Sequence, residues 1–235
     1  MKIRVMSYNT QHCASYKNGL KIDLPLFFET IKSIGADVVV LNEMRSRGRD
    51  DDYLDQSAIL AEGADYPYSY FAEAIRFGGV NPYGNSLLSR IALSEAETVM
   101  IEDPAERKYD GYYETRCILK AKLECGLTVL GVHVGLNPDE QENAITALLQ
   151  HITEEKCILL GDFNMSPDDP FIGRIKEKLF DTGSLLPTDT CTFPSDAPSR
   201  KIDYIFTSPD IKIERVYVPE LVVSDHRPII ADISF

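Results

Sequence analysis

The sequence predicts an α+β domain in which β-sheets are covered by helices on their outer faces. Short apolar runs that are typical of strands recur along the whole chain, and helix patterns interrupt them at only a few places. The 235 residues contain no long linker, low-complexity tract or short-period repeat. A single domain spanning residues 1–235 is therefore expected, because folds of this class often reach that length as one unit.

The first predicted elements alternate between strand and helix. An apolar run at Ile3–Tyr8 predicts a strand. Asp23 is a preferred N-cap and Gly35 a typical residue just after a helix end, so a helix is expected between them. The continuous run Val38–Leu41 is typical of a strand buried on both faces. Acidic early positions then predict a short helix at residues 51–63.

Strand patterns dominate the rest of the chain. Residues 76–84 hold three glycines and a proline, which predicts a loop. Strands are then expected at residues 85–88, 91–100, 115–123, 127–134, 157–160, 202–206, 211–218 and 228–233. Helices are expected at residues 138–149, where Pro and acidic residues come first, and near residues 170–179. The apolar run Leu221–Val223 also has the character of a strand.

The charge balance limits the classes of function. The chain has 24 Lys and Arg against 37 Asp and Glu, which gives a formal net charge of −13 at pH 7. This charge disfavours a protein that holds duplex nucleic acid by its phosphates, because such proteins need clustered basic residues. A small phosphorylated substrate stays compatible, since a local arginine and a metal ion can offset the global charge.

The cysteines and the N-terminus bear on the cellular compartment. Five cysteines are scattered without a Cys-x-x-Cys pair, which is not typical of a disulfide framework. The first residues lack the apolar core of a signal peptide, and no apolar run approaches the ~20 residues of a membrane-spanning helix. We therefore expect a cytoplasmic protein without a transmembrane segment, and the sequence leaves its oligomeric state open.

Polar residues suited to metal or phosphate chemistry follow several predicted strands. They are Asn9, Glu43, His133, Asp162, Asn164 and the pair Asp225-His226. A strand end holds a side chain rigidly while the adjoining loop opens it to solvent. Asp203 lies instead among apolar residues, and a buried carboxylate is costly unless it is paired. We therefore expect Asp203 to pair with His226; the alternative for each position is an ordinary turn.

The order of these motifs resembles that of the endonuclease/exonuclease/phosphatase superfamily. The motifs are Ser-Tyr-Asn9, Leu-Asn-Glu43, Gly84-Asn85, Glu-Thr-Arg116, Gly-Val-His133, Gly-Asp162-Phe-Asn164, Ile-Asp203-Tyr-Ile and Ser-Asp225-His226-Arg-Pro. The resemblance spans residues 3 to 235. It implies a four-layer α/β/β/α sandwich of two packed mixed β-sheets flanked by helices, with the site at one edge of the sheets. It also implies a metal-dependent phosphoric ester hydrolase.

The resemblance implies a Mg²⁺ site, where Mn²⁺ is an alternative ion. Glu43 is the expected first ligand, because Mg²⁺ prefers oxygen and typically takes one or two carboxylates. Asn9 is expected to hold the metal or the phosphate through its amide. Asp225 is expected to add a second carboxylate contact.

The resemblance also implies how water is activated and how the substrate is held. Asp203 would fix the tautomer of His226. Asp162 is the other candidate for deprotonating the attacking water, with Asn164 aiming it, and the residues alone do not decide between Asp162 and His226. Arg116 and His133, with Asn164, are expected to bind the phosphate oxygens, and Asn85 is expected to line the pocket.

Two departures from the abasic-site endonuclease branch favour a small substrate. Gln11 stands where that branch has an acidic residue, and His133 stands where it has Asn. The chain also has no Trp to wedge into a DNA helix. We therefore expect in-line attack of water on a small phosphomonoester or phosphodiester. A DNA-cleaving nuclease and a catalytically silent binding module on the same scaffold are the alternatives.

Overall fold

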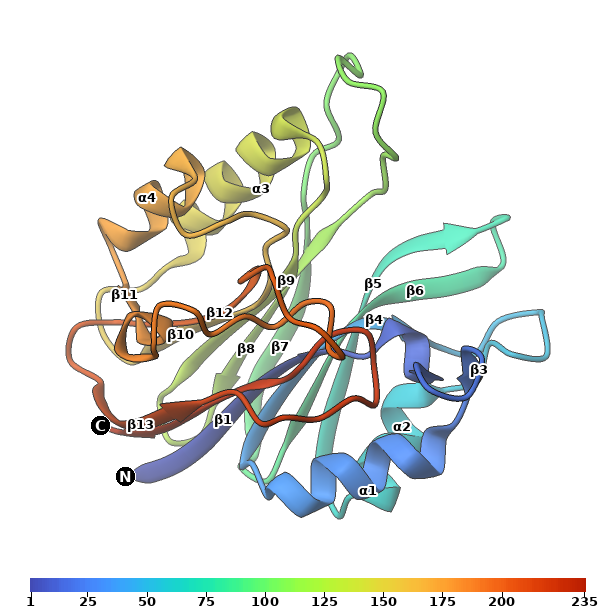
Figure 1. Cartoon of the computed structure of the whole chain (residues 1–235), viewed down its shortest axis with the longest axis horizontal. Helices are drawn as coiled ribbons and strands as arrows, with labels where there is room; N and C mark the ends of the chain where they lie inside the picture. The colour runs from blue at the N-terminus through green and yellow to red at the C-terminus, as the bar shows by residue number, and fades with distance from the viewer.

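Two six-stranded sheets pack face to face in the computed structural model, which describes all residues 1–235 (Figure 1). The first sheet contains, from edge to edge, β13 (Lys212–Tyr217), β14 (Ile229–Ser234), β1 (Lys2–Asn9), β4 (Val38–Arg45), β6 (Asn81–Ser89) and β5 (Tyr68–Phe77). The second contains β11 (Phe180–Asp181), β12 (Asp203–Thr207), β10 (Cys157–Asp162), β9 (Thr128–His133), β8 (Cys117–Leu123) and β7 (Leu93–Met100). Both sheets are mixed, since β1 runs parallel to β4 and β9 runs parallel to β10.

Helices cover the outer face of each sheet. The first sheet carries α1 (Leu24–Ile34) and α2 (Gln56–Gly63), and the second carries α3 (Pro138–His151) and α4 (Pro170–Lys176) (Figure 1). Smaller elements are the ribbon of β2 (Ala14–Ser15) and β3 (Lys21–Ile22) and the 3₁₀ turns Gln11–Cys13 and Thr182–Leu185. The predicted four-layer α/β/β/α sandwich is confirmed.

The alternation of side chains along β4 shows how the layers are built. Val38 and Val40 belong to the core between the two sheets, whereas Val39 and Leu41 belong to the core beneath α1 and α2. Successive strand residues point to opposite faces, so a strand in the middle of a sandwich must be apolar at every position. This requirement explains the unbroken apolar run that predicted the strand.

The start of α1 was predicted correctly and the start of α2 was not. The Asp23 side chain accepts a hydrogen bond from the Leu26 backbone N–H at 3.1 Å, and Gly35 ends the helix with a φ of 66°. In the second helix, Asp55 is the N-cap and residues 51–55 lie before the helix. The acidic residues at 51–52 therefore belong to a turn, and the prediction of a helix from residue 51 is wrong.

Residues 76–84 form the tip of a β-hairpin: residues 78–80 are its turn, whereas residues 76–77 and 81–84 belong to β5 and β6, so the predicted loop is wrong for these strand residues. The strands β5 and β6 pair across this segment, and the register shifts between Glu73 and Ile75. At Gly84 a Cβ atom would lie 2.0 Å from the Ala72 carbonyl oxygen of the neighbouring strand. The glycine is thus required by close approach of two backbones inside the sheet, which sequence alone does not distinguish from a turn.

The apolar run Leu221–Val223 is also not a strand. It lies in the irregular connection between β13 and β14, where the Val223 carbonyl oxygen accepts a hydrogen bond from the Tyr16 N–H at 2.8 Å. The next residue, Ser224, donates its N–H to the Tyr8 hydroxyl at 3.1 Å. The bond to Tyr8 holds the connection against β1 of the first sheet, and His226 lies two residues farther along it.

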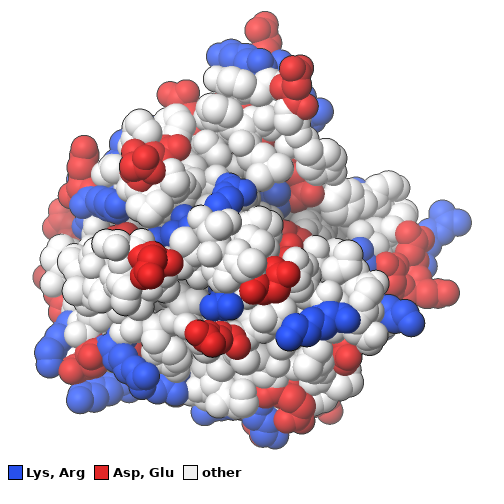
Figure 2. All heavy atoms as spheres, viewed as in Figure 1, with Lys and Arg blue, Asp and Glu red and all other residues white.

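The two chain termini are close together, and charged side chains of both signs lie on the surface. The termini lie side by side at one end of the sandwich, because β1 and β14 are antiparallel neighbours (Figure 1). Acidic and basic side chains are interspersed over the face shown in Figure 2. No helix has both the length and the apolar character needed to cross a membrane.

Candidate active site

The strand register places three predicted site residues in one row of the second sheet. Asp162 is paired with His133 on one side and with Asp203 on the other. All three side chains are buried. Two carboxylates directly opposite each other repel, so a positive group between them is favoured. We therefore expect a positively charged group near Asp162 and Asp203.

His226 supplies that positive group. Its Nδ1 lies 2.9 Å from Asp203 Oδ2, and its Nε2 lies 3.6 Å from Asp162 Oδ2. Burial by itself lowers the pKa of His226, but the negative charges of Asp203 and Asp162 outweigh it and raise the pKa to about 10. The imidazolium form is therefore the stable one at neutral pH, flanked by two carboxylates.

A second row of polar side chains, on β1 and β4 of the first sheet, connects the two sheets at the end of the sandwich where Asp162 lies. Asn9 and Asn42 are neighbours across β1 and β4. The Asn9 amide donates to Asp162 Oδ2 and to Glu43 Oε1, both at 3.0 Å. Asn42 accepts from the Asp162 N–H at 3.0 Å and donates to the Val132 carbonyl oxygen at 2.9 Å. Asn42 was not among the predicted site residues, although an amide at the end of an apolar strand is a signal that the sequence shows.

Three donor atoms converge on one oxygen of Asp162. Oδ2 has Asn9 Nδ2 at 3.0 Å, His133 Nε2 at 3.5 Å and His226 Nε2 at 3.6 Å. The other oxygen accepts the Asn164 N–H at 2.9 Å. Burial raises the pKa of Asp162 to about 7, against the opposing effect of the His226 charge. A carboxyl group with this pKa can take up and release a proton near neutral pH.

Glu43 stands at a break in its strand. The register between β4 and β6 shifts between Leu41 and Met44, and Glu43 has a φ of 60°. This is the left-handed region that non-glycine residues seldom occupy, and Asn164 shares it with a φ of 53°. Such strained residues persist where the surroundings hold them, and they are common at functional sites. The bulge leaves the Glu43 carboxylate only half-buried.

Arg116 and Glu114 flank His133 on the side away from Asp162. Arg116 Nη1 lies 3.0 Å from His133 Nδ1 and 2.5 Å from Glu114 Oε1. A guanidinium has only donors, so His133 Nδ1 accepts and the ring proton of neutral His133 sits on Nε2, which faces Asp162 Oδ2. Asn164 Nδ2, 3.2 Å from Nε2, donates instead to the Val134 carbonyl oxygen at 3.0 Å. Burial and the charges of Arg116 and His226 hold the pKa of His133 well below its usual range. Glu114 was not among the predicted site residues, although it belongs to the Glu-Thr-Arg116 motif.

Asn85, Asn9 and Asp225 were expected to line the pocket or to hold the metal ion, and in the structure their side chains bond to other residues of the protein. Asn85 is buried beneath the cluster, where it accepts from Asn42 Nδ2 at 2.8 Å and donates to the Cys117 carbonyl oxygen at 3.2 Å. Asn9 turns its amide nitrogen to the two carboxylates, and the flipped amide would set oxygen against oxygen. Asp225 is half-buried and accepts from the Ser224 hydroxyl at 3.0 Å. Burial and the charge of Glu43 raise its pKa.

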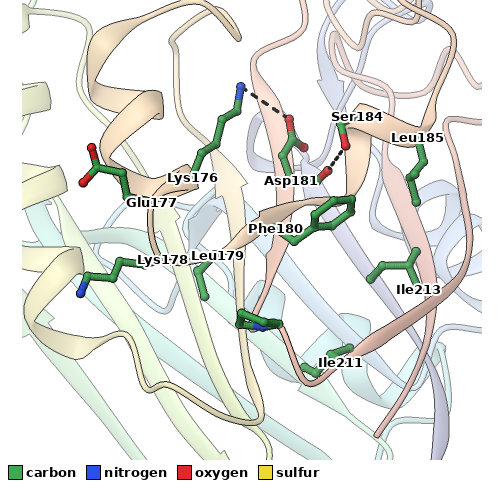
Figure 3. Close-up of a pocket in the computed structure, with 11 residues that line it drawn as sticks. Lys176, Glu177, Lys178, Leu179, Phe180, Asp181, Ser184, Leu185, Ile211 and Ile213 are labelled. Carbon is green, nitrogen blue, oxygen red and sulfur yellow. Dashed lines mark hydrogen bonds and ion pairs between the residues drawn. The ribbon is translucent and has the colours of Figure 1, made fainter.

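A large pocket lies away from this cluster. It measures about 720 Å³ and is formed around β11 and the start of β13, at the opposite end of β12 from Asp203 (Figure 3). Three of its polar residues contact one another: Lys176 pairs with Asp181 at 4.0 Å, and the Ser184 hydroxyl donates to the Asp181 carbonyl oxygen at 2.7 Å. The candidate active site is therefore identified by its chemistry and not by cavity size.

Comparison with known proteins agrees with this geometry. The model of the Endonuclease/Exonuclease/phosphatase family matches residues 6–226. The chain belongs to this family. The match takes in both rows of the site, from Asn9 to His226. No protein with a curated description matches the sequence.

Solved structures with the endonuclease/exonuclease/phosphatase fold cover the whole chain. One from Beutenbergia cavernae has 23% identity and a TM-score of 0.82, over 100% of this chain and 72% of the other. A mannosyl-6-phosphatase from Bacteroides thetaiotaomicron has 17% identity and a TM-score of 0.76, over 99% and 100%. The human Nocturnin catalytic domain has 17% identity and a TM-score of 0.73, over 100% and 93%. At these identities the likeness shows the fold.

Proposed function

We propose that this protein is a divalent-metal-dependent hydrolase of small phosphomonoesters or phosphodiesters. The observation that carries the proposal is the convergence of Asn9, His133 and His226 on one oxygen of Asp162. Burying several ionisable groups together is costly, and a fold needs no such cluster for stability alone. Phosphatases among the structures with the same fold support a phosphoester as the substrate.

Glu43 and Asp225 are the residues that would hold the metal ion. Their carboxylate oxygens suit a hard divalent cation, and the charge of Glu43 already raises the pKa of Asp225. The cluster of Asp162, Asp203 and His226 is a poorer site, because the His226 imidazolium already lies between the two carboxylates. Asn9 would orient Glu43 through its amide. When bound, Mg²⁺ or Mn²⁺ would polarise the phosphoryl oxygen and stabilise the leaving alkoxide.

The chain's own residues divide the remaining work. Asp162 would take the proton of the attacking water, because its pKa is raised to about 7. Asn164, whose N–H is tied to Asp162, would aim that water. His226, held by Asp203, would present a positive charge to the phosphoryl oxygens. This charge favours the transition state, in which negative charge spreads over those oxygens.

Arg116 and His133 would bind the non-bridging oxygens of the phosphate. The Nε2 proton of His133 and the guanidinium of Arg116 are donors, as phosphate oxygens require. Their attachment to one another fixes both donors before the substrate arrives, which favours in-line attack by a well-placed water.

The test is hydrolysis of p-nitrophenyl phosphate and bis-p-nitrophenyl phosphate by chelator-treated protein, with and without Mg²⁺ or Mn²⁺. We expect turnover only with metal, and a loss of about 10²–10⁴-fold in kcat for His226→Ala. Glu43→Gln should weaken Mn²⁺ binding measured by calorimetry, a readout that needs no activity. Arg215→Ala, on β13, is the control and should match the unmodified protein. Absence of turnover on any phosphoester with either metal would refute the proposal.

A further inference from the structure

A separate pocket adjoins the catalytic cluster. It measures about 500 Å³ and is formed by residues 164–169 together with parts of the segment 188–202. Asn164 stands in its wall, and Asn164 Nδ2 lies 3.2 Å from His133 Nε2. Asn164 is therefore shared by the pocket wall and the cluster, which places the pocket next to the proposed phosphate site.

Arg200 stands in the wall of this pocket with its charge uncompensated. The exposed guanidinium forms no ion pair and no hydrogen bond. It lies over the Phe193 ring at 5.8 Å, and that ring is 4.8 Å from the His226 ring. Both distances are measured to the centre of the Phe193 ring. Their sum is therefore the upper limit of the distance between Arg200 Cζ and the centre of the His226 ring. A substrate of sugar-phosphate size can span it.

The backbone that carries Arg200 is fixed to the backbone of the site. Residues 193 and 200 form a β-bridge in which the Arg200 N–H donates to the Phe193 carbonyl oxygen at 2.9 Å. The Ser195 N–H donates to the Asp225 carbonyl oxygen at 2.7 Å, and the Arg227 N–H donates to the Thr192 carbonyl oxygen at 2.8 Å. The guanidinium therefore stands on a loop already positioned against His226, which lowers the cost of ordering it on binding.

The other two charged side chains that line the pocket, Lys201 and Asp169, already have partners within the protein. Lys201 Nζ lies 2.9 Å from Asp181 Oδ2, so its charge is neutralised. Asp169 accepts the Phe171 N–H at 2.8 Å as the cap of α4. In a chain of net charge −13, an unpaired arginine beside the site is the group that would attract an anion. The planar guanidinium of Arg200, with its paired N–H groups, suits a phosphate or a carboxylate.

We propose that this pocket binds a second anionic group of the substrate through Arg200. The inference rests on the proposed function and deepens it: the cleaved phosphate would lie against Arg116 and His133, and a second phosphate or a carboxylate would lie against Arg200. The preferred substrates are then small phosphoesters that carry two anionic groups. Arg200 sets this specificity and takes no part in the chemical step.

The experiment compares matched substrates with one and two anionic groups. Fructose 6-phosphate is paired with fructose 1,6-bisphosphate, and glycerol 3-phosphate is paired with 3-phosphoglycerate, which separates a phosphate from a carboxylate as the second anion. We expect a KM about tenfold lower for the doubly anionic member of at least one pair. Arg200→Ala should abolish that preference through a rise in KM, and Arg200→Lys should keep part of it. Arg215→Ala, another exposed arginine over an aromatic ring, should keep all of it.

The outcomes separate this inference from the proposed function. Hydrolysis without preference in either pair, or a preference that survives Arg200→Ala, would overturn the inference and leave the phosphoesterase proposal standing. If no compound is hydrolysed, binding decides: calorimetric titration of Glu43→Gln with fructose 1,6-bisphosphate should show affinity that falls about tenfold on adding Arg200→Ala. Equal binding by the two variants, or no binding at all, would refute the second-anion site.

Discussion

Glu114 acts on the proposed phosphate site through another residue. Its carboxylate is 2.5 Å from Arg116 Nη1, and the two side chains are only 9% and 12% exposed. Arg116 in turn meets His133 at 3.0 Å, so the direction of the guanidinium depends on Glu114. Removing one partner of a mostly buried pair leaves the other charge without compensation, which costs more than the pair contributes.

We predict that Glu114→Gln lowers the free energy of unfolding by about 1–3 kcal/mol, measured by urea denaturation. It should also change the ¹⁵N shifts of the His133 ring, because the donor at Nδ1 moves. Glu97→Gln is the matched control, since its partner Lys120 lies at the surface and the carboxylate is 58% exposed. It should change neither quantity. Unchanged ¹⁵N shifts of the His133 ring in Glu114→Gln would contradict the positioning role.

His226 should link stability to pH in the metal-free protein. Its pKa is raised from 6.5 to about 10 in the folded state, so the folded protein binds a proton that the unfolded chain has released. This contribution is complete below pH 6.5 and is lost as the pH rises to about 10. We predict that His226→Gln flattens the fall in unfolding free energy over this interval, measured with chelator present. Parallel curves for the two proteins would show that the imidazolium is not stabilised.

The sequence predicted the ionisable residues of the site better than their partners. Asp203 and His226 could be paired in advance, because a carboxylate among apolar residues needs a positive neighbour. Asn42 and Phe193 could not, since their contacts depend on how two sheets and a distant loop meet. The orientation of the Asn9 amide is equally absent from the sequence signal, because it is set by Glu43 on the neighbouring strand β4 and by Asp162 on β10 of the other sheet.

Among the elements, a strand was predictable where its own residue pattern is enough to show which of its faces are buried. The run at Val38–Leu41 identified β4, because both faces of that strand are covered. The hairpin of β5 and β6 was missed, because Gly84 serves a contact with the neighbouring strand and not a turn. The run Leu221–Val223 gave the opposite error, since the Val223 carbonyl oxygen bonds to Tyr16, a turn residue, and not to a strand. Errors arise where tertiary contacts decide the conformation.

The close approach of the two sheets at Gly131 gives a test at this scale. A Cβ atom on this residue of β9 would lie 2.8 Å from Val40 Cγ1 of β4. We predict that Gly131→Ala destabilises the fold by about 1–3 kcal/mol in urea denaturation, because the sheets must separate to admit a methyl group. Gly173→Ala in α4 is the control, as nothing lies within 4 Å of its Cβ position. The control should be neutral or stabilising by up to about 1 kcal/mol.

For the whole molecule, the distribution of charge separates the two substrate classes open to the family. The face in Figure 2 shows basic side chains in separate patches among acidic ones, not as a continuous stripe. Positive charge beside the site comes instead from single arginines: Arg116, which is paired with Glu114, and the unpaired Arg200. A small anion can be held by these few contacts, whereas a duplex presents phosphates over a length that this surface would repel.

We therefore predict that a 30-base-pair duplex is not retained in a gel-shift assay at ~0.15 M salt, even at the micromolar concentrations that suffice for ordinary non-specific DNA binding. Lowering the salt to ~0.01 M strengthens the binding of proteins that neutralise many phosphates, because counterion release then favours the complex. Here it should not produce a complex, since a net charge of −13 is screened less at low salt. Plasmid nicking with Mg²⁺ under both conditions tests the same point by activity. Tight binding that weakens steeply with salt, accompanied by nicking, would identify a nuclease and displace the small substrate from the proposed function.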